Sequence, residues 1–233
     1  MESRGILELL DLTLLDHEAG DETLEELCEK ANQFRPAAVC VFSKHAPFVG
    51  SGLDDGVALA VVAAGFPVGS ESPEEIANEI REAVAMGAEE IDCVLEPRDE
   101  RGFPDERELA KLIAMREASQ GCRLKVIVEA PLIDERRLRA VTRMVLASGA
   151  DFVKTCTGKR GTCSDEAARV ISAEIHRHCL SFEGRPGVKL SGGIRSKEEA
   201  ERLIDIVIEQ DDSISGRGRL RIGASSLFEE LIE

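Results

Sequence analysis

Short β-like runs alternate with helix-like segments along the whole of this 233-residue chain. The runs are rich in Val, Ile, Leu and Ala, as in buried strands, and the stretches between them have amphipathic, helical spacing. We place strands at residues 6–12, 37–42, 58–64, 90–95, 125–129, 152–155, 188–190 and 220–222. Eight strands separated by helices are typical of a (β/α)8 TIM barrel, an α/β fold that forms one domain of this length.

Helix start and stop signals support this alternation. Capping residues or proline precede first-turn acids near residues 21, 72, 104, 134, 164 and 196. Gly87 and Gly149 end two helices alike, where glycine can adopt the left-handed conformation. No linker divides the chain, so we expect a single domain over residues 1–233. The alternative is an open, doubly wound sheet made from the same elements.

Charge and cysteine usage limit the possible partners and the compartment. The formal net charge is −16 and no long basic stretch occurs, which argues against nucleic acid or an anionic membrane as a partner. The longest apolar run, residues 57–64, is too short to cross a bilayer, and the N-terminus does not resemble a signal peptide. Seven cysteines without a Cys-x-x-Cys pair indicate a reducing compartment. We therefore expect a cytoplasmic protein.

Three predicted strands carry a charged residue inside an otherwise apolar run: Asp92, Lys154 and Lys189. If the strands of the two lysines are parallel neighbours, their amines lie close together, and each ammonium makes the other harder to charge. Asp92 makes such charges tolerable in a barrel interior. One lysine could then be a neutral nucleophile that forms an imine, with Asp92 moving protons. The alternative is a purely structural ion triad.

Glycine-rich turns follow the last three strands. They are Gly158-Lys159, Ser191-Gly192-Gly193 and Gly223-Ala224-Ser225-Ser226. Glycine turns and helix N-termini offer backbone amides to phosphate, and TIM barrels favour the loops after strands seven and eight for this purpose. Together with the paired lysines, these turns predict an imine-forming enzyme that acts on a phosphorylated carbonyl compound.

These motifs resemble the deoxyribose-phosphate aldolases, a family of class I aldolases with a TIM-barrel fold. The matching segments cover nearly the whole chain and lie at residues 11–13, 39–41, 65–69, 90–92, 125–129, 152–158, 189–195 and 222–226. The resemblance implies reversible cleavage of 2-deoxy-D-ribose 5-phosphate to D-glyceraldehyde 3-phosphate and acetaldehyde, without a metal or cofactor. It also implies that Lys154 is the Schiff-base lysine, that Lys189 keeps it uncharged, and that Asp92 relays protons.

The resemblance further implies a set of substrate contacts. Lys159, Gly192, Gly193, Ser225 and Ser226 would hold the phosphate, with Gly158, Ser191 and Gly223 in the same turns, while Asp11 and Thr157 would contact hydroxyls or water. Cys40 is interpreted as packed core, yet it remains a candidate because a cysteine near an aldehyde site can form adducts. Relatives commonly form dimers or tetramers, so a homo-oligomer is expected.

The chain departs from the family pattern after Cys40, Asp92 and Glu129, and it contains no tyrosine. A proton relay through a C-terminal tyrosine is therefore not part of the expected mechanism. Glu129 is either a second polar group in the barrel or the partner of an internal arginine. Two other functions stay open: a lysine-dependent aldolase for a ketose phosphate, and a non-catalytic phosphate-binding barrel.

Overall fold

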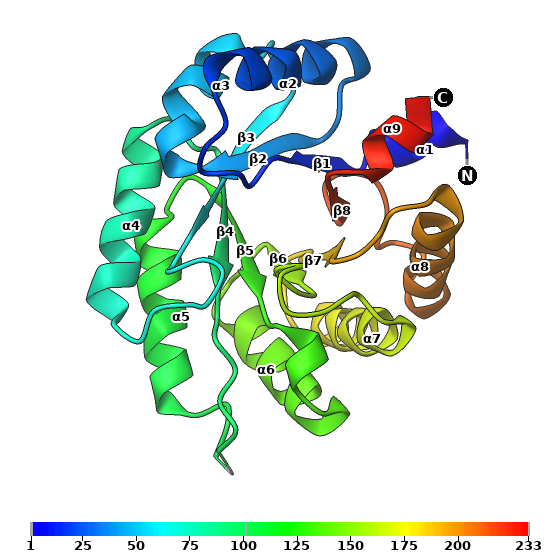
Figure 1. Cartoon of the computed structure of the whole chain (residues 1–233). Helices are drawn as coiled ribbons and strands as arrows, with labels where there is room; N and C mark the ends of the chain where they lie inside the picture. The colour runs from blue at the N-terminus through cyan, green and yellow to red at the C-terminus, as the bar shows by residue number, and fades with distance from the viewer. Residues whose placement is uncertain (1, 101, 233) are drawn as a thin grey trace.

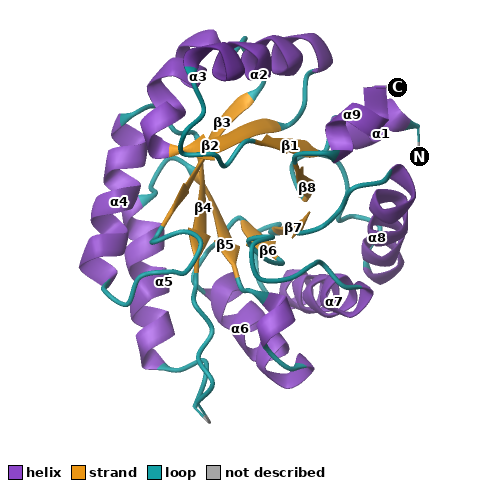
Figure 2. Ribbon diagram, viewed as in Figure 1, coloured by secondary structure: helices purple, strands orange, loops and turns teal. Residues whose placement is uncertain are grey.

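Eight parallel strands close into a barrel in the computed structural model, which describes residues 2–100 and 102–232 (Figures 1 and 2). Each strand is hydrogen bonded to the next, and β1 also pairs with β8. The strands are β1 (Leu10–Thr13), β2 (Ala38–Phe42), β3 (Ala58–Ala63), β4 (Glu90–Val94), β5 (Arg123–Ile127), β6 (Phe152–Lys154), β7 (Gly187–Ser191) and β8 (Leu220–Ala224). The predicted TIM barrel is confirmed, and the open sheet is excluded.

Helices surround the barrel and fill the connections between its strands (Figure 2). They are α1 (Ser3–Leu7), α2 (Asp21–Phe34), α3 (Ala46–Gly52), α4 (Pro73–Ala85), α5 (Glu106–Ala118), α6 (Glu135–Ala147), α7 (Asp165–Ser181), α8 (Lys197–Gln210) and α9 (Leu227–Ile232). The first and last helices pack against each other, so the two ends of the chain lie close together (Figure 1).

The helix boundaries follow the capping signals in the sequence. The side chains of Ser72, Asp105, Asp134, Ser164 and Ser196 each accept a backbone N–H in the first turn of the helix that they precede. Gly87 and Gly149 have φ angles of 97° and 80°, which is the left-handed conformation predicted for them. Each glycine therefore ends its helix and turns the chain toward the next strand.

The predicted first strand, residues 6–12, is wrong at its start. Residues Ser3–Leu7 form the short helix α1, and β1 begins only at Leu10. The run Ile6-Leu7-Glu8-Leu9-Leu10 is too short for its apolar spacing to separate a helix from a strand. Ile6 and Leu7 are buried on α1, which packs against α8 and α9, so tertiary contacts decide the outcome.

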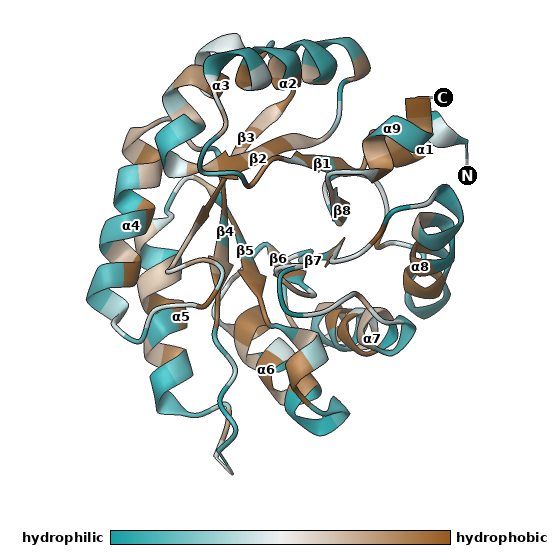
Figure 3. Cartoon of the chain, viewed as in Figure 1, coloured by the Kyte–Doolittle hydropathy of each residue, from teal (hydrophilic) through white to brown (hydrophobic). Residues whose placement is uncertain are grey.

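Two apolar clusters reflect the alternation of side chains along the strands. The larger lies between barrel and helices and includes Val39 and Val61. The smaller consists of Ala38, Cys40, Ala60 and Val62, which alternate with the first set on β2 and β3 and therefore face the barrel interior. Figure 3 shows the matching pattern on the helices, whose apolar faces turn toward the barrel and whose hydrophilic faces turn outward.

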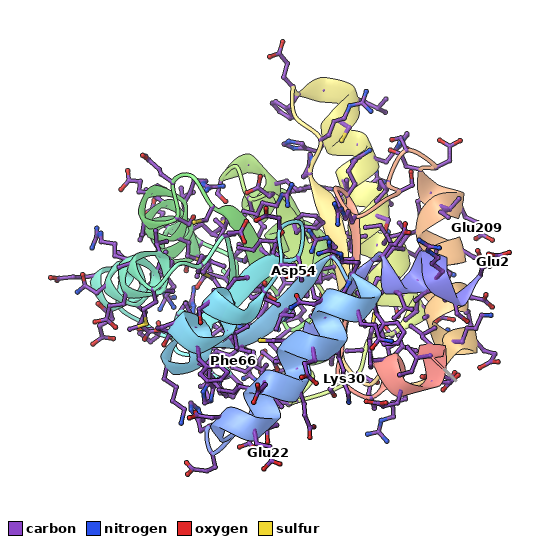
Figure 4. All side chains as sticks on the ribbon, turned by 90° about the horizontal axis from the view of Figure 1, so that it is seen from above. Glu2, Glu22, Lys30, Asp54, Phe66 and Glu209 are labelled. Carbon is purple, nitrogen blue, oxygen red and sulfur yellow. The ribbon has the colours of Figure 1, made fainter. Side chains whose placement is uncertain are left out.

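The acidic excess lies on the outside of the molecule. Glu22 on α2 and Glu209 on α8 are exposed and project away from the barrel (Figure 4). Exposed carboxylates are readily solvated, so the net charge of −16 needs no functional explanation. Within residues 2–100 and 102–232, no helix is long and apolar enough to cross a membrane.

Candidate active site

Asp92 lies at the centre of the barrel interior and accepts hydrogen bonds from three lysines. Its Oδ2 lies 2.8 Å from Lys154 Nζ and 2.6 Å from Lys189 Nζ. Its Oδ1 lies 2.9 Å from Lys125 Nζ. The two lysines are neighbours because β6 and β7 pair with Lys154 directly opposite Lys189. The structure thus brings together the three side chains expected from the sequence.

Lys125 is the member of this group to which the sequence analysis gave no role. It is fully buried, and besides Asp92 it lies 3.0 Å from Asp11 Oδ2 and 2.6 Å from Glu90 Oε2. The signal was present, because Lys125 stands between Leu124 and Val126 just as the other two lysines stand in apolar runs. Its partnership with Asp92 follows from the register of β4 and β5, which sets these two residues opposite each other.

Asp11 does not occupy the place expected for a substrate contact. Its carboxylate is fully buried and binds Lys189 at 2.5 Å, Lys125 at 3.0 Å and Arg221 at 2.5 Å. Arg221 in turn binds Glu90. Asp11 contacts the lysines and Arg221 and does not line the cavity, so the expectation that it contacts substrate hydroxyls or water is corrected: it supports the lysines instead.

Cys40, like Asp11, is not among the residues that line the cavity at the carboxyl ends of the strands. It is fully buried and packs with Ala38, Ala60 and Val62, in keeping with its interpretation as core. Burial raises the pKa of its thiol to about 11. A thiol that stays protonated at neutral pH is a weak nucleophile, which argues against its alternative role near the aldehyde.

The electrostatic state of the network follows from its neighbours. Burial alone would raise the pKa of Asp92, but Lys125, Lys154 and Lys189 outweigh it and hold that pKa well below its usual range. Burial works against the charged form of Lys189, yet the carboxylates of Asp11 and Asp92 more than compensate and raise the pKa of its amine. Lys189 is therefore a permanent cation next to Lys154.

The buried charges of the interior do not balance if every group is ionised. Among the described residues of the network, four cations (Lys125, Lys154, Lys189 and Arg221) face three carboxylates (Asp11, Glu90 and Asp92). Arg123 also reaches Glu90, but half of its side chain lies in solvent. Lys154 has the fewest partners of the four, since its amine pairs with Asp92 alone within this network.

A cavity of about 610 Å³ opens above Lys154 at the carboxyl ends of the strands. Nine other residues expected at the substrate site line it: Thr157, Gly158, Lys159, Ser191, Gly192, Gly193, Gly223, Ser225 and Ser226. Arg195 and residues 13–16 at the end of β1 also line it and were not assigned to the site from the sequence. Lys159 and Arg195 in this lining supply the cationic character that a phosphate group requires.

The glycines of these turns are needed for their shape. Gly158, Gly192 and Gly193 have φ angles of 76°, 102° and 73°, a conformation that other residues rarely adopt. A Cβ on Gly223 would lie 2.9 Å from Lys189 Cε, so this glycine leaves space for the lysine. Ser191, the last residue of β7, is bound to the β6–α7 loop, because its hydroxyl donates to Cys156 O at 2.6 Å.

Of the two alternatives for Glu129, the structure shows the pair with an arginine. Its side chain is fully buried, and its Oε2 lies 3.2 Å from Arg160 Nε. Among the described residues, no group of three or more His, Cys, Asp or Glu side chains is placed to hold a metal ion.

Comparisons with known proteins agree with this geometry. Residues 7–227 match the model of the DeoC/LacD family aldolases. The deoxyribose-phosphate aldolase of Lysinibacillus sphaericus is 35% identical over 223 residues, which is 94% of this chain and 91% of that protein. The one from Finegoldia magna is 32% identical over 217 residues, covering 93% and 94%. The solved deoxyribose phosphate aldolase of Aeropyrum pernix superposes with a TM-score of 0.80 at 26% identity, covering 99% of this chain and 91% of that one. The chain belongs to the DeoC/LacD family of aldolases.

Proposed function

We propose that this protein cleaves 2-deoxy-D-ribose 5-phosphate reversibly to D-glyceraldehyde 3-phosphate and acetaldehyde, with Lys154 as the Schiff-base lysine. One observation carries the proposal: Lys154 is the lysine of the buried network that also lines the cavity. Its amine thus meets both the charges that govern its protonation and the space in which a sugar phosphate fits. The named relatives are aldolases for this substrate, which supports the choice.

The chemistry begins with the neutral amine. Lys154 Nζ attacks the C1 aldehyde of the open-chain sugar, and loss of water from the carbinolamine gives an iminium ion. The C3 hydroxyl then loses its proton, the C2–C3 bond breaks, and its electron pair flows toward the iminium to form an enamine. D-Glyceraldehyde 3-phosphate leaves at this step. Protonation of the enamine at C2 and hydrolysis release acetaldehyde and return the free amine.

Asp92 and Lys189 control protons during these steps. Asp92 lies 2.8 Å from the Lys154 nitrogen, close enough to take up and return protons through that amine or a bound water. Lys189 remains charged and disfavours a second ammonium beside it. Lys125 fixes the other oxygen of Asp92, so the carboxylate cannot rotate away from the reacting nitrogen.

The phosphate end of the substrate is proposed to lie among the three glycine turns. Lys159 and Arg195 supply cations there, and Gly192, Gly193, Ser225 and Ser226 supply backbone N–H and hydroxyl donors. This placement puts the aldehyde end of the sugar toward Lys154, at the inner end of the same cavity.

Borohydride trapping tests the proposal. Reduction in the presence of acetaldehyde should attach an ethyl group to Lys154, located by peptide mapping, because the imine becomes a stable secondary amine. Trapping with a ketose phosphate but not with acetaldehyde would instead indicate an aldolase for ketose phosphates. No adduct with either compound would indicate a phosphate-binding barrel without this chemistry.

Assembly and location are part of the proposal. The relative from Aeropyrum pernix is described as a tetramer, and we expect this chain to form a dimer or tetramer. Light scattering coupled to gel filtration measures this directly. The seven cysteines are free in the structure, which is compatible with the cytoplasm as the place of action.

A further inference from the structure

The loop between β6 and α7, residues 155–164, carries four residues to the cavity: Thr157, Gly158, Lys159 and Thr162. Gly158 and Lys159 are exposed, and a loop of this kind needs contacts that fix its shape before a ligand arrives. One end is fixed by the hydrogen bond from Cys163 N to Gly192 O at 2.9 Å. The next residue, Arg160, does not line the cavity, and its side chain binds residues of other loops.

Arg160 connects this loop to the three loops that follow β3, β4 and β5. Its guanidinium pairs with both oxygens of Glu96, with Nη1–Oε1 at 2.7 Å and Nη2–Oε2 at 2.6 Å. Nη2 also lies 3.2 Å from Pro67 O, and Nε lies 3.2 Å from Glu129 Oε2. We call Arg160, Glu96, Glu129 and Pro67 the arginine clamp. It joins the loops that follow four consecutive strands, β3 to β6.

Glu129 connects the clamp to the cavity wall. It is fully buried, and its Oε1 accepts the backbone N–H of Thr157, which lines the cavity. Its Oε2 has no hydrogen bond, so Arg160 is the cation that compensates this buried carboxylate. Without that cation, Glu129 would have to take up a proton or move toward water, and in either case its hold on Thr157 would weaken.

We infer that Arg160 is a positioning residue for the phosphate end of the substrate, acting through Glu129 on residues 157–159. The inference rests on the proposed function, because it assigns Arg160 to the binding of the phosphate that this function requires. Arg160 itself is directed to carboxylates and needs no contact with the substrate. An arginine is required because one planar guanidinium group binds Glu96 through Nη1 and Nη2 and pairs with Glu129 through Nε. A lysine offers a single point charge instead.

The test compares a phosphorylated and an unphosphorylated substrate. In Arg160→Met, kcat/KM for 2-deoxyribose 5-phosphate should fall at least tenfold, mainly through KM, while kcat/KM for 2-deoxyribose should stay within about twofold. Arg160→Lys should recover part of the loss. The ratio of the two kcat/KM values is the readout, since a general loss of folded enzyme lowers both equally. An unchanged ratio in Arg160→Met would overturn the inference.

Arg98→Met is the matched control. Arg98 also forms a two-pronged pair, with Glu108 at 2.8 and 2.7 Å, but it lies on the β4–α5 connection and does not line the cavity. Its loss should leave the ratio of kcat/KM values unchanged. If Arg160→Met folds poorly, the double variant Arg160→Met/Glu129→Gln removes the buried negative charge and keeps an oxygen acceptor for Thr157. In this double variant the ratio should return toward the wild-type value, because a neutral amide needs no cation to keep its hold on Thr157. A ratio that stays at least tenfold below the wild-type value would contradict action through Glu129.

A measurement that does not depend on catalysis separates the two proposals. Inorganic phosphate should slow hydrogen–deuterium exchange of residues 155–164 in the wild type and have a much smaller effect in Arg160→Met. A wild type that cleaves nothing but shows this pattern would refute the aldolase function and retain the clamp. Equal protection by phosphate in both proteins would refute the clamp.

Discussion

The two halves of the barrel interior differ in kind. On β2 and β3 the inward side chains are small and apolar, with Ala38, Cys40, Ala60 and Val62 in one cluster. The remaining strands contribute the charged network around Asp92. A barrel interior normally packs with apolar side chains throughout, and burying an uncompensated charge costs several kcal/mol, about the stability of a domain. The contrast supports the proposal that the charges serve the chemistry, and their burial is tolerated because each has a partner.

The largest effect on activity is expected at Lys154, which belongs to the charged half and lines the cavity. Lys154→Leu should lower kcat by more than about 10³-fold and abolish trapping of acetaldehyde, because the nucleophile is gone. The melting temperature should stay close to that of the wild type, because Asp92 keeps Lys125 and Lys189 as partners. Lys159→Leu is the control: it should raise KM and keep the trapping. Retained trapping in Lys154→Leu would assign the imine to another amine.

The next effect concerns the stability of the charged half. Asp92→Asn leaves three lysines without their common carboxylate and should lower the free energy of unfolding by about 3–5 kcal/mol. Urea unfolding at pH 7 measures this. A loss below about 1 kcal/mol would mean that the lysines lose their charge easily, and the contrast between the two halves would then be weaker than the structure indicates.

Acid should act on the charged half in the same direction. Lysine and arginine partners outweigh burial and lower the pKa values of Asp11, Glu90 and Asp92. Groups with depressed pKa values stabilise the fold above their unfolded pKa of about 4 and lose this contribution as the pH falls below it. Unfolding free energies measured between pH 5 and pH 3 should therefore decrease, and less steeply in Asp92→Asn. Parallel curves for the two proteins would contradict the role of Asp92.

Lys189→Leu should change the pH profile as well as the rate. Removing the permanent cation favours the charged form of Lys154, so the rising limb of kcat/KM should move to higher pH by at least about one unit. Turnover at neutral pH falls in consequence. A profile that only drops in height, without moving along the pH axis, would show that Lys189 acts by packing alone.

The smallest effect is expected in the apolar half. Cys40→Ala removes one buried sulfur from the small apolar cluster and should cost about 1 kcal/mol of stability or less. Activity should stay within about twofold, because Cys40 does not line the cavity. A large rise in KM would return Cys40 to the substrate site and would extend the functional region into this half of the barrel.

Most of the fold could be predicted from local patterns, and so could the centre of the site. Strand-borne charges such as Lys154 stand out because an apolar run tolerates a charge only with a partner. Lys125 carried the same signal. The arginine clamp could not be predicted, because Glu96, Glu129 and Arg160 lie in irregular loops whose meeting depends on barrel closure. The ion pair between Asp11 and Arg221 could not be predicted either, because these residues lie near opposite ends of the sequence and no local spacing relates them.

The filled interior beneath Lys154 has a kinetic consequence. Asp11, Lys125 and Arg221 are buried in the barrel interior, so we expect molecules to reach the amine through the cavity that Lys154 lines. In the proposed mechanism the two-carbon fragment stays bonded to Lys154, while the phosphorylated fragment lies nearer the mouth of the cavity. Cleavage must therefore release D-glyceraldehyde 3-phosphate first and acetaldehyde last, and synthesis must load acetaldehyde before its acceptor. Product inhibition should follow the pattern of this compulsory order.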